Sequence, residues 1–423
     1  MASGPLDGVK VLEFGQIYAA PLACQMLSDL GADVIKVEPV EGEPWRVNNQ
    51  FVPFESKGFQ ALNRGKRSPA IDLSKPKGQA AVHRLVKRVD VVVVNYRADV
   101  AKNLHIDYQT LAAIRPELIY ADNTAFGRKG ELAERPGFDI VAQAMAGVIA
   151  AIGKVDEEGA PVAVLSPPFL DTTTAYAIVG GVCAALYHRA MTGQRQLVET
   201  SLLINALTIH ATHFVSNHAA DAEQRRDFFA ATDRASAEGK TFAEFLASRG
   251  SLTGANPGFY YRCYVTCDGA VAVGALSASL RAKLRTALKI EHNRDEAGYD
   301  LDDPQQQVID RETTRRVEEL FRTQSSDYWE ALLGSHGVPV SRVNFVQTLQ
   351  EHPQVVANDY VIELEHDLTG PQWMAAPPWK MSVTPPAAQG ASPPLGRDTD
   401  AILTDAGLSA REISQMRRKG VIR

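Results

Sequence analysis

The feature that most constrains the fold is a regular alternation of strand-like and helix-like segments up to residue 123. Short apolar runs, among them VDVVVVN, predict strands at residues 9–14, 33–38, 90–95 and 118–123. Apolar residues at helical spacing predict helices between them, at residues 21–30, 76–88 and 108–114. Strands that alternate with helices build parallel sheets with helices on both faces. The pattern therefore predicts an α/β fold with an open, mostly parallel, Rossmann-like sheet.

The rest of the chain shows different residue patterns. Helical patterns continue through residues 138–153, 172–191 and 198–213, and Gly193 ends the second of them. The run YYRCYVTCDGAVAVGA predicts a hairpin that turns at Asp268-Gly269, and helices follow to about residue 333. The proline-rich tail is expected to be extended, and two helices, at 398–406 and 410–419, close the chain.

These patterns predict three regions. A large α/β domain is expected at residues 1–218, and a smaller α+β domain at residues 219–340. Residues 341–423 are expected to be a return linker and C-terminal helices that pack on the large domain. The small domain would thus be linked twice to the large one.

The composition limits the kinds of partner that this protein is expected to bind. The 423 residues include 45% hydrophobic and 22% charged residues, with a net charge of −6, as in an ordinary globular enzyme. No basic stripe points to nucleic acid. No leader-like segment opens the chain, and the apolar run at 175–186 is too short to cross a bilayer. We therefore expect a cytoplasmic protein with no membrane or nucleic-acid partner.

The cysteines give no metal site. Four cysteines are too few for a disulfide framework in a chain of this length. Cys263 and Cys267 would share one face of a strand, but no matching pair of ligands stands elsewhere in the sequence. We expect both to be buried core residues, since free cysteine behaves as a small hydrophobe.

The first strand-to-helix turn, EFGQIYAAP, argues against a nicotinamide cofactor. A dinucleotide fold needs several glycines there, so that the backbone can approach a pyrophosphate. This turn has Gly15 alone, followed by Tyr18 and Ala19. Glu38, at the end of the second strand, stands where a ribose-binding acid would be expected, but it does not replace the missing glycines.

Two basic positions are candidates for phosphate binding. The segment NRGKRS places Arg64, Lys66 and Arg67 in a short glycine-containing loop. Such a loop is either a solvated charge run or a clamp for phosphate groups. Arg97 follows a buried strand, at the edge where open α/β sheets bind ligands.

Asp171, in the phrase SPPFLDTTTAYA, precedes a predicted helix. An aspartate there is a preferred N-cap whose side chain accepts a backbone N–H. The helix dipole and donated hydrogen bonds would also keep the carboxylate ionised, as a nucleophile must be. The two roles are compatible, so Asp171 is the candidate nucleophile.

Several long phrases resemble one family, in the same order along the chain. They are LDGVKVLEFGQIYAAPLACQMLSDLGADVIKVEPVEGEPWR, LNRGKRSPAIDLSKPKG, VVVVNYRADVAKNL, RPGFDIVAQAMAG, RAMTGQRQLVETSLL and PPLGRDTDAILTDAGLSAREISQMRRKGVI. These phrases are similar to the class III CoA-transferases of the CaiB/BaiF type, which include formyl-CoA and carnitine CoA-transferases. The resemblance runs over almost the whole chain and is weakest at about residues 210–255.

The resemblance implies a mechanism and a site. Asp171 matches the family's nucleophile, which passes through an acyl anhydride and an aspartyl-CoA thioester. Acyl-CoA would then be a substrate, with no tightly bound cofactor and no metal. Oxyanion and substrate contacts would come from Gln16, Tyr18, Ala19, Phe138, Gly254 and Gly258. Residues implied or expected to bind CoA are Glu38, Arg64, Lys66, Arg67, Asn95, Tyr96 and Arg97.

The family also implies an assembly and leaves the substrates open. Its subunits are rings that interlock in a homodimer. Tyr18 stands where the formyl-CoA enzyme has glutamine, which argues against formyl-CoA and oxalate as substrates. Asn103 replaces a frequent arginine, so one phosphate contact is expected to be absent or supplied elsewhere. Small dicarboxylates, branched acids, carnitine-like acids and aromatic acids all stay open as partners of the acyl-CoA donor.

Two other functions stay in view. The α-methylacyl-CoA racemases share the fold but use a histidine in a Gly-His-Asp segment as one of two bases. Here the segment is Gly137-Phe138-Asp139, and phenylalanine cannot carry a proton. A non-catalytic acyl-CoA binding protein would bind the thioester without exchanging it, and the presence of Asp171 argues against that reading.

Overall fold

A computed structural model describes residues 4–248, 258–300 and 303–423. The chain divides into two compact units. Unit 1 comprises residues 1–249 and 356–423, and unit 2 comprises residues 250–355. The smaller domain was expected to begin at residue 219, whereas helices α12 (His218–Ala237) and α13 (Phe242–Ser248) group with unit 1.

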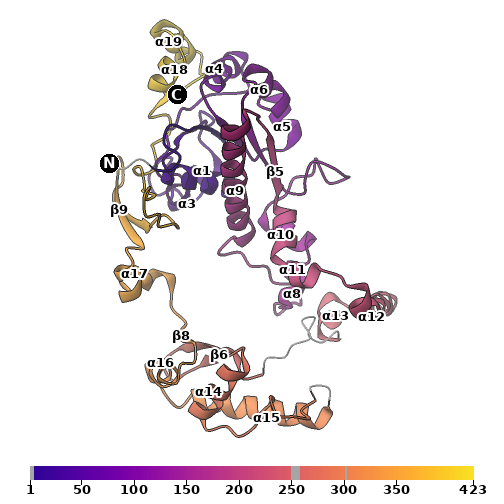
Figure 1. The fold of residues 1–423 in the computed structure, drawn as a ribbon. Helices are drawn as coiled ribbons and strands as arrows, with labels where there is room; N and C mark the ends of the chain where they lie inside the picture. Colours follow the sequence, from indigo (N-terminus) through magenta and orange to yellow (C-terminus); the bar gives the residue numbers. More distant parts are fainter. Residues whose placement is uncertain (1–3, 249–257, 301–302) are drawn as a thin grey trace. The chain divides into compact units, whose positions relative to one another are not determined.

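Unit 1 is built on a five-stranded sheet in the order β2-β1-β3-β4-β5. All neighbouring strands are parallel, which confirms the predicted sheet type (Figure 1). The four strands predicted from the sequence are all present, and one more lies at the edge. Their bounds are β1 (Lys10–Phe14), β2 (Asp33–Lys36), β3 (Val91–Val94), β4 (Ile119–Thr124) and β5 (Leu197–Ser201).

Both faces of this sheet are covered, because the strands are apolar on both sides. Val91 and Val93 of β3 pack on the face covered by α1 (Ala19–Asp29) and α9 (Phe169–Thr192). Val92 and Val94 point to the opposite face, where helices from both ends of the chain pack. The period of two along a strand therefore assigns each valine to one of two separate cores.

The remaining helices of unit 1 follow the alternation expected from the sequence. Before β4 the chain forms α2 (Pro44–Val47), α3 (Lys57–Leu62), α4 (Pro76–Val86), α5 (Ala98–Asn103) and α6 (Tyr108–Ile114). After β4 it forms α7 (Asp139–Met145), α8 (Val148–Ile152), α10 (Leu202–Ile209) and α11 (Ala211–Phe214). The predicted helices at 76–88 and 108–114 are therefore confirmed.

The prediction of one helical run at residues 198–213 was wrong in its first part. Leu197–Ser201 forms β5, which pairs with β4 in register Tyr120 to Leu197. Ser201 then caps α10, and its side chain accepts the N–H of Ile204. A short apolar run is compatible with either structure, and here the free edge of β4 decides in favour of a strand.

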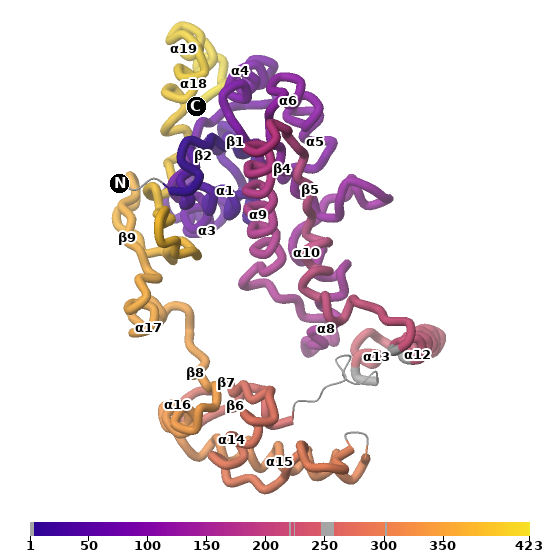
Figure 2. Tube along the Cα trace, viewed as in Figure 1, coloured from indigo at the N-terminus to yellow at the C-terminus, as the bar shows by residue number. Residues whose placement is uncertain are grey.

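The C-terminal segment packs back on the N-terminal part of unit 1. Helices α18 (Thr399–Asp405) and α19 (Ala410–Arg418) bury Ile402, Ile413 and Met416 in the same core as α4. The yellow C-terminal helices lie beside the indigo and violet N-terminal segments in Figure 2. The hairpin of β9 (Val361–His366) and β10 (Gly370–Ala375) also belongs to unit 1.

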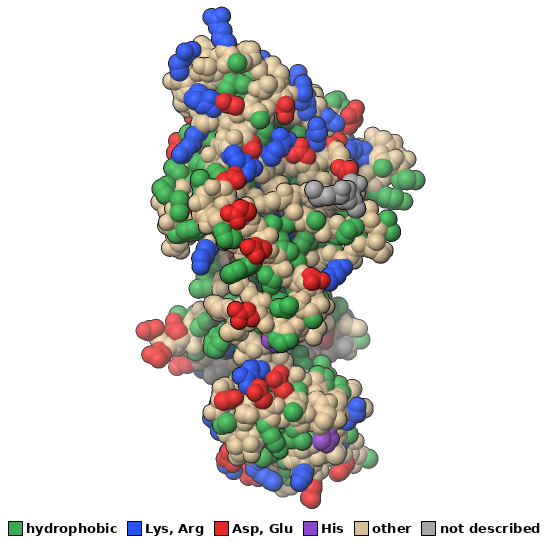
Figure 3. Space-filling model, turned by 90° about the vertical axis from the view of Figure 1, so that its left-hand side faces the viewer, with side chains coloured by type: hydrophobic (Ala, Val, Ile, Leu, Met, Phe, Trp, Pro, Cys, Tyr) green, Lys and Arg blue, Asp and Glu red, His purple; other side chains and the backbone are tan. Residues whose placement is uncertain are grey.

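The outer surface of these C-terminal helices is basic but mixed in charge. Lys and Arg side chains gather at the top of the molecular face in Figure 3, over α18 and α19. Acidic partners reduce this charge, since Arg417 pairs with Asp400 at 2.5 Å and Arg84 with Glu412 at 3.5 Å. Exposed pairs of this kind contribute little to stability.

Unit 2 is a small α+β unit. Its antiparallel sheet has the order β6-β7-β8, and the predicted hairpin is confirmed as β6 (Tyr261–Val265) and β7 (Ala270–Gly274). The other elements are β8 (Val340–Arg342), α14 (Ala278–Leu288), α15 (Pro304–Phe321), α16 (Ser326–Ser335) and the 3₁₀ helix η1 (Val346–Glu351). Helix α17 (Pro353–Ala357) spans the boundary with unit 1.

The expectation that Cys263 and Cys267 are buried was wrong. Cys263 lies on the outer side of β6 and Cys267 in the hairpin turn, and both are exposed. The covered side of β6 is formed instead by Tyr264, which stacks on Phe321 in the core of unit 2. Strand alternation therefore turned Cys263 towards solvent, whereas the strand ends before Cys267, which lies in the exposed turn.

Helix α9 has the length and composition of a membrane-crossing helix, the one case among the residues described. The core helix of a soluble protein meets the same criterion. In this fold α9 buries Ile178, Val179 and Val182 against α1 and the sheet. Its apolar character is therefore used in packing within unit 1.

Candidate active site

A cavity of about 500 Å³ opens at the carboxyl ends of β1, β2 and β3. Between β1 and β3 the strand order reverses direction, and crevices at such points are where open α/β sheets bind ligands. Six of the site residues predicted from the sequence line it together, and the remaining wall is mostly apolar. Those six are Gln16, Glu38, Asn95, Tyr96, Arg97 and Phe138.

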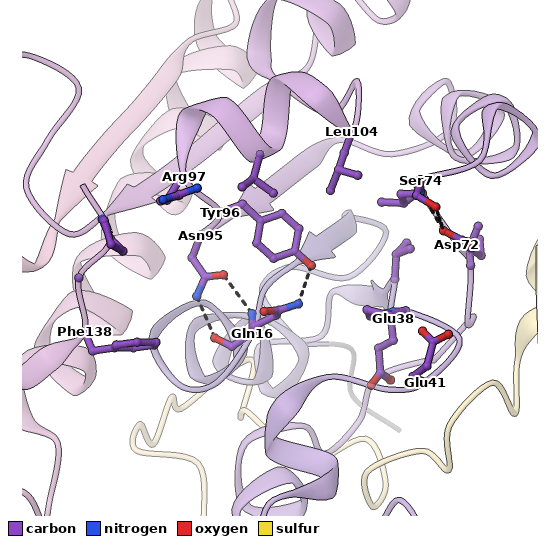
Figure 4. Close-up of a pocket in the computed structure, with 17 residues that line it drawn as sticks. Gln16, Glu38, Glu41, Asp72, Ser74, Asn95, Tyr96, Arg97, Leu104 and Phe138 are labelled. Carbon is purple, nitrogen blue, oxygen red and sulfur yellow. Dashed lines mark hydrogen bonds between the residues drawn. The ribbon is translucent and has the colours of Figure 1, made fainter. Parts of the chain in front are cut away.

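Asn95 and Tyr96 hold Gln16 in place inside this cavity (Figure 4). The Asn95 side chain accepts the Gln16 N–H at 3.0 Å and donates to the Gln16 carbonyl at 2.9 Å. The Gln16 side chain donates to the Tyr96 hydroxyl at 3.1 Å. The turn after β1 and the turn after β3 are therefore locked to each other.

Glu38 borders the cavity but is engaged in an ion pair. Its carboxylate accepts from Arg46 at 2.6 and 2.9 Å and from the Ser68 hydroxyl at 2.7 Å. Burial alone would raise the pKa of Glu38, but Arg46, Lys36 and Ser68 together hold that pKa below its ordinary value. Glu38 is therefore part of the buried ion-pair network, and a ligand in the cavity would contact only the edge of the Glu38 side chain.

Arg64 and Lys66 do not form the expected phosphate clamp. The Arg64 guanidinium is buried against the Asp29 carboxylate at 2.7 Å. The Lys66 ammonium lies 2.7 Å from Glu13 and donates to Asn63 and to the Pro21 carbonyl. These cations point inward because the loop passes over β1 and α1, whose carboxylates they neutralise. Neither faces the cavity at the strand ends.

Arg67 and Arg97 differ in position. Arg67 pairs with Asp33 at 2.5 Å near the opposite ends of the strands, away from this cavity. Arg97 lines the cavity, and 43% of its side chain is exposed. It pairs with Asp99 at 2.9 Å, an exposed contact that a phosphate could replace. Arg97 is therefore the cation best placed for an anionic ligand at this cavity.

Asp171 lies in the first turn of α9, but it is not the N-cap that the sequence suggested. The helix begins at Phe169 and Pro168 is the capping position. The cap is provided by Asp139, which accepts the N–H groups of Leu170 and Asp171, both at 3.0 Å. Because another carboxylate satisfies those donors, the side chain of Asp171 is left free for chemistry.

The environment of Asp171 disfavours its charged form. Burial, and then the neighbouring charge of Asp139, raise the pKa of Asp171 to about 7. The expectation that the helix dipole keeps this carboxylate ionised was therefore wrong, since desolvation is the larger effect. Perturbed carboxyl groups of this kind are characteristic of functional sites.

Asp171 is half-buried and is not part of the cavity wall itself. Two features connect Asp171 to the cavity. Asp139 follows Phe138, a wall residue whose side chain is 61% exposed. Tyr18, two residues after Gln16, brings its hydroxyl to 3.4 Å from the hydroxyl of Thr172. The nucleophile candidate thus stands beside the cavity rather than within it.

The predicted oxyanion contacts are only partly available. The N–H of Gln16 donates to Asn95, and the N–H of Ile17 donates to Glu43 at 2.7 Å. Tyr18 and Ala19, at the start of α1, have backbone N–H groups without an acceptor among the described residues. Gly258 is buried beside Arg294 in unit 2, and Gly254 lies outside the described residues.

Sequence reasoning missed three residues that shape the site. Asp139 caps α9, and Gln143 donates to Asp139 and is clamped to the backbone of Val164. Glu43 is buried beneath the first turn. Asp139 stood next to a residue that was considered, but nothing in the sequence tells a capping carboxylate from a solvated one.

Among the residues that the structure describes, no group of three or more His, Cys, Asp or Glu side chains is arranged to hold a metal ion. The polar groups around the cavity and Asp171 are instead carboxylates, amides, hydroxyls and one guanidinium. The chemistry to be explained is therefore that of a carboxylate beside a crevice.

This fold and crevice define a class of enzyme, and comparison with known proteins identifies it. The family described as CoA-transferase family III matches residues 6–399. The chain belongs to this family and is a CoA-transferase, which uses CoA thioesters as substrates. It is 28% identical to human succinyl-CoA:glutarate CoA-transferase, over 99% of this chain and 90% of the relative.

Three further proteins are similar to this chain. Succinyl-CoA:mesaconate CoA-transferase of Haloarcula hispanica is 30% identical, over 96% of this chain and 97% of the relative. A solved CaiB/BaiF family protein from Brucella suis is 28% identical, with a TM-score of 0.72 over 96% of this chain and all of that one (100%). A Mycobacterium tuberculosis protein, 24% identical with a TM-score of 0.73 over 95% of this chain and 99% of its own, shares the fold.

Proposed function

We propose that this enzyme transfers CoA from an acyl-CoA to a carboxylic acid through covalent intermediates on Asp171. The observation that carries the proposal is a half-buried carboxylate in the first turn of α9 with a pKa raised to about 7. Its helix is capped by a different carboxylate, that of Asp139. A poorly solvated carboxylate is a stronger nucleophile once ionised, because less solvent must be removed from it.

The reaction would proceed in four transfers. A carboxylate oxygen of Asp171 attacks the donor's thioester carbonyl, and the C–S bond breaks to release CoA thiolate and leave an acyl anhydride. The thiolate attacks the aspartyl carbonyl, which frees the donor acid and leaves an aspartyl-CoA thioester. The acceptor carboxylate then attacks that thioester, and its C–S bond breaks to release the thiolate and leave a second anhydride. The thiolate attacks the acceptor's carbonyl in this anhydride and forms the acceptor's CoA ester. Asp171 is regenerated as a carboxylate.

Each tetrahedral intermediate needs hydrogen-bond donors for its oxyanion. The N–H groups of Tyr18 and Ala19 suit this role, since they open α1 and no described group accepts from them. Tyr18 also contacts Thr172, the residue that follows Asp171. The start of α1 and the start of α9 would thus flank the reacting carbonyl.

The cavity at the strand ends would hold CoA. Its walls of Val37, Ile71, Leu73 and Val100 suit the adenine and the pantetheine arm, while Arg97 suits a phosphate. Phe138 occupies the wall where a racemase would need a proton carrier, which favours transfer over epimerisation. The names of the relatives suggest a small acyl-CoA donor and a small carboxylic acid acceptor.

A homodimer is part of this proposal. The resemblance to the family supports it, and unit 1 exposes apolar side chains that a second copy could cover. Among them are Tyr187 at 70%, Met191 at 68% and Phe214 at 63% exposure. Light scattering on the purified protein should give twice the mass of the 46.0 kDa chain. A monomer at micromolar concentration would refute the dimer.

Trapping the intermediate tests the covalent mechanism. The enzyme is incubated with acyl-CoA and hydroxylamine, digested and analysed by mass spectrometry. We expect a hydroxamate on the peptide that contains Asp171. We also expect Asp171→Asn to lower transfer by more than about 1,000-fold while CoA still binds, because the nucleophile is lost but the cavity is intact.

The matched control is Asp400→Asn, which changes an exposed carboxylate on α18, outside the proposed chemistry. It should retain the wild-type yield of hydroxamate. Labelling at another residue, or full turnover by Asp171→Asn after deamidation has been excluded, would refute Asp171 as the nucleophile.

A further inference from the structure

Ile17 has a backbone conformation that its side chain disfavours. Its φ is +70°, in the left-handed region, which a β-branched residue almost never adopts. It lies between Gln16, which lines the cavity, and Tyr18, which contacts the start of α9. Such a conformation persists only where the surroundings impose it, and it is often found where the position of neighbouring groups matters.

A buried carboxylate imposes it. Glu43 is 1% exposed and accepts the Ile17 N–H at 2.7 Å through one oxygen. Its other oxygen lies 3.0 Å from the ammonium of Lys36, which is also fully buried. A hydrogen bond from an amide to a charged, desolvated acceptor is among the stronger ones in proteins.

Lys36 completes the restraint on the other side of Gln16. Its ammonium donates to the Gly15 carbonyl at 2.7 Å and to Glu13 at 2.9 Å. The peptide groups before and after Gln16 are therefore held from beneath by Lys36 and Glu43. Asn95 holds the N–H and carbonyl of Gln16 itself. Because the Gln16 carbonyl and the Ile17 N–H belong to one peptide group, removing Glu43 would leave this group held only at its carbonyl, by Asn95.

We propose that Glu43 is a positioning residue for CoA transfer, acting through the Ile17 N–H to set the N–H groups of Tyr18 and Ala19 opposite Asp171. This inference rests on the proposed function. Without the carboxylate, Ile17 would relax towards negative φ and the following peptides would turn. Misplacement of catalytic groups by about 1 Å can cost about 100-fold in rate.

The test uses the full-length enzyme with two substitutions at Glu43. Glu43→Gln removes the charge, and Glu43→Asp keeps the charge beside Lys36 but shortens the reach to Ile17. For both we expect kcat to fall about 10- to 100-fold. The Kd for CoA should stay within about threefold, because Asn95 and Tyr96 still hold Gln16.

Rescue separates positioning from general structural damage. Ile17→Gly removes the penalty of positive φ, since glycine adopts it freely. Adding Ile17→Gly to either Glu43 variant should restore kcat to within about threefold of wild type. A merely structural role for Glu43 beside Lys36 would not respond to this second change.

Glu55→Gln is the matched control. Glu55 is equally buried and pairs with Arg46, but it does not touch the first turn. Its kcat per folded molecule should stay within about twofold of wild type. If Glu43→Gln does not fold, Glu43→Asp decides the question.

Two results would overturn the inference: a Glu43 variant that folds with unchanged kcat, or folded double variants that Ile17→Gly fails to rescue. Failure of the proposed function is recognised separately. In that case the wild-type enzyme itself would give no hydroxamate on Asp171.

Discussion

The interior beneath β1 and the opening of α9 both bury carboxylates, but they treat them in opposite ways. Beneath β1, Glu13 and Glu38 each face a buried cation, and the pKa of Glu38 is lowered. At α9, Asp171 faces another carboxylate, and burial raises its pKa to about 7. A buried acid that is paired with a cation has a structural role, whereas a buried acid without a cation partner stays available for reaction.

The same comparison applies to the cations. Arg64 and Lys66 looked like phosphate ligands in the sequence, yet both are consumed by buried acids. Arg97 looked less conspicuous, but its partner Asp99 is exposed and the guanidinium borders the cavity. Whether a cation can bind a ligand therefore depends on the groups that already surround it, and not on its position in a basic loop.

The largest expected effect is a loss of stability when Lys66 is replaced, which tests whether this paired cation is structural. Lys66→Met should lower the free energy of unfolding by about 3–5 kcal/mol, because Glu13 would lose one of its two buried cations. Denaturant titration measures this change. The Kd for CoA on the folded fraction should stay within about twofold of wild type. A variant that weakens CoA binding without losing stability would restore the phosphate-clamp hypothesis.

The second prediction concerns the pH dependence that Asp171 imposes. Because its pKa is raised to about 7, the ionised nucleophile accumulates only as pH rises through that value. We expect kcat, measured with saturating substrates, to be about 100-fold lower at pH 5 than at pH 8. An acceptor acid with a pKa below about 4 stays ionised throughout and serves as the control. A flat profile above pH 5 would show that Asp171 is ionised like a solvated carboxylate.

The smallest effect is expected at Arg97. Arg97→Ala should weaken CoA about tenfold, because one charge-assisted contact to phosphate is lost. The affinity for a pantetheine thioester that lacks the nucleotide should not change. Arg411→Ala, on the exposed surface of α19, is the matched control and should bind both ligands normally. Equal losses for the two ligands would place Arg97 away from the phosphates.

Much of the fold could be read from local patterns. Period-two and period-3.6 spacing placed β1 to β4, α4 and α6, because these repeats depend only on which side chains must be buried. The same reasoning placed Asn95, Tyr96 and Arg97 at the end of a buried strand, where the cavity is found. The phrase around Asp171 placed a carboxylate at the start of a helix.

Other features depended on partners far away in sequence. The strand β5 exists because β4 offers a free edge, and Arg64 and Lys66 turn inward because Asp29 and Glu13 lie beneath their loop. Asp139 caps α9 from another segment, and Glu43 reaches Ile17 across the first crossover. Sequence determined which groups this protein has and which side of each element they occupy. Only tertiary structure decided which charges are neutralised and which are left to react, because burial and pairing arise when distant segments meet.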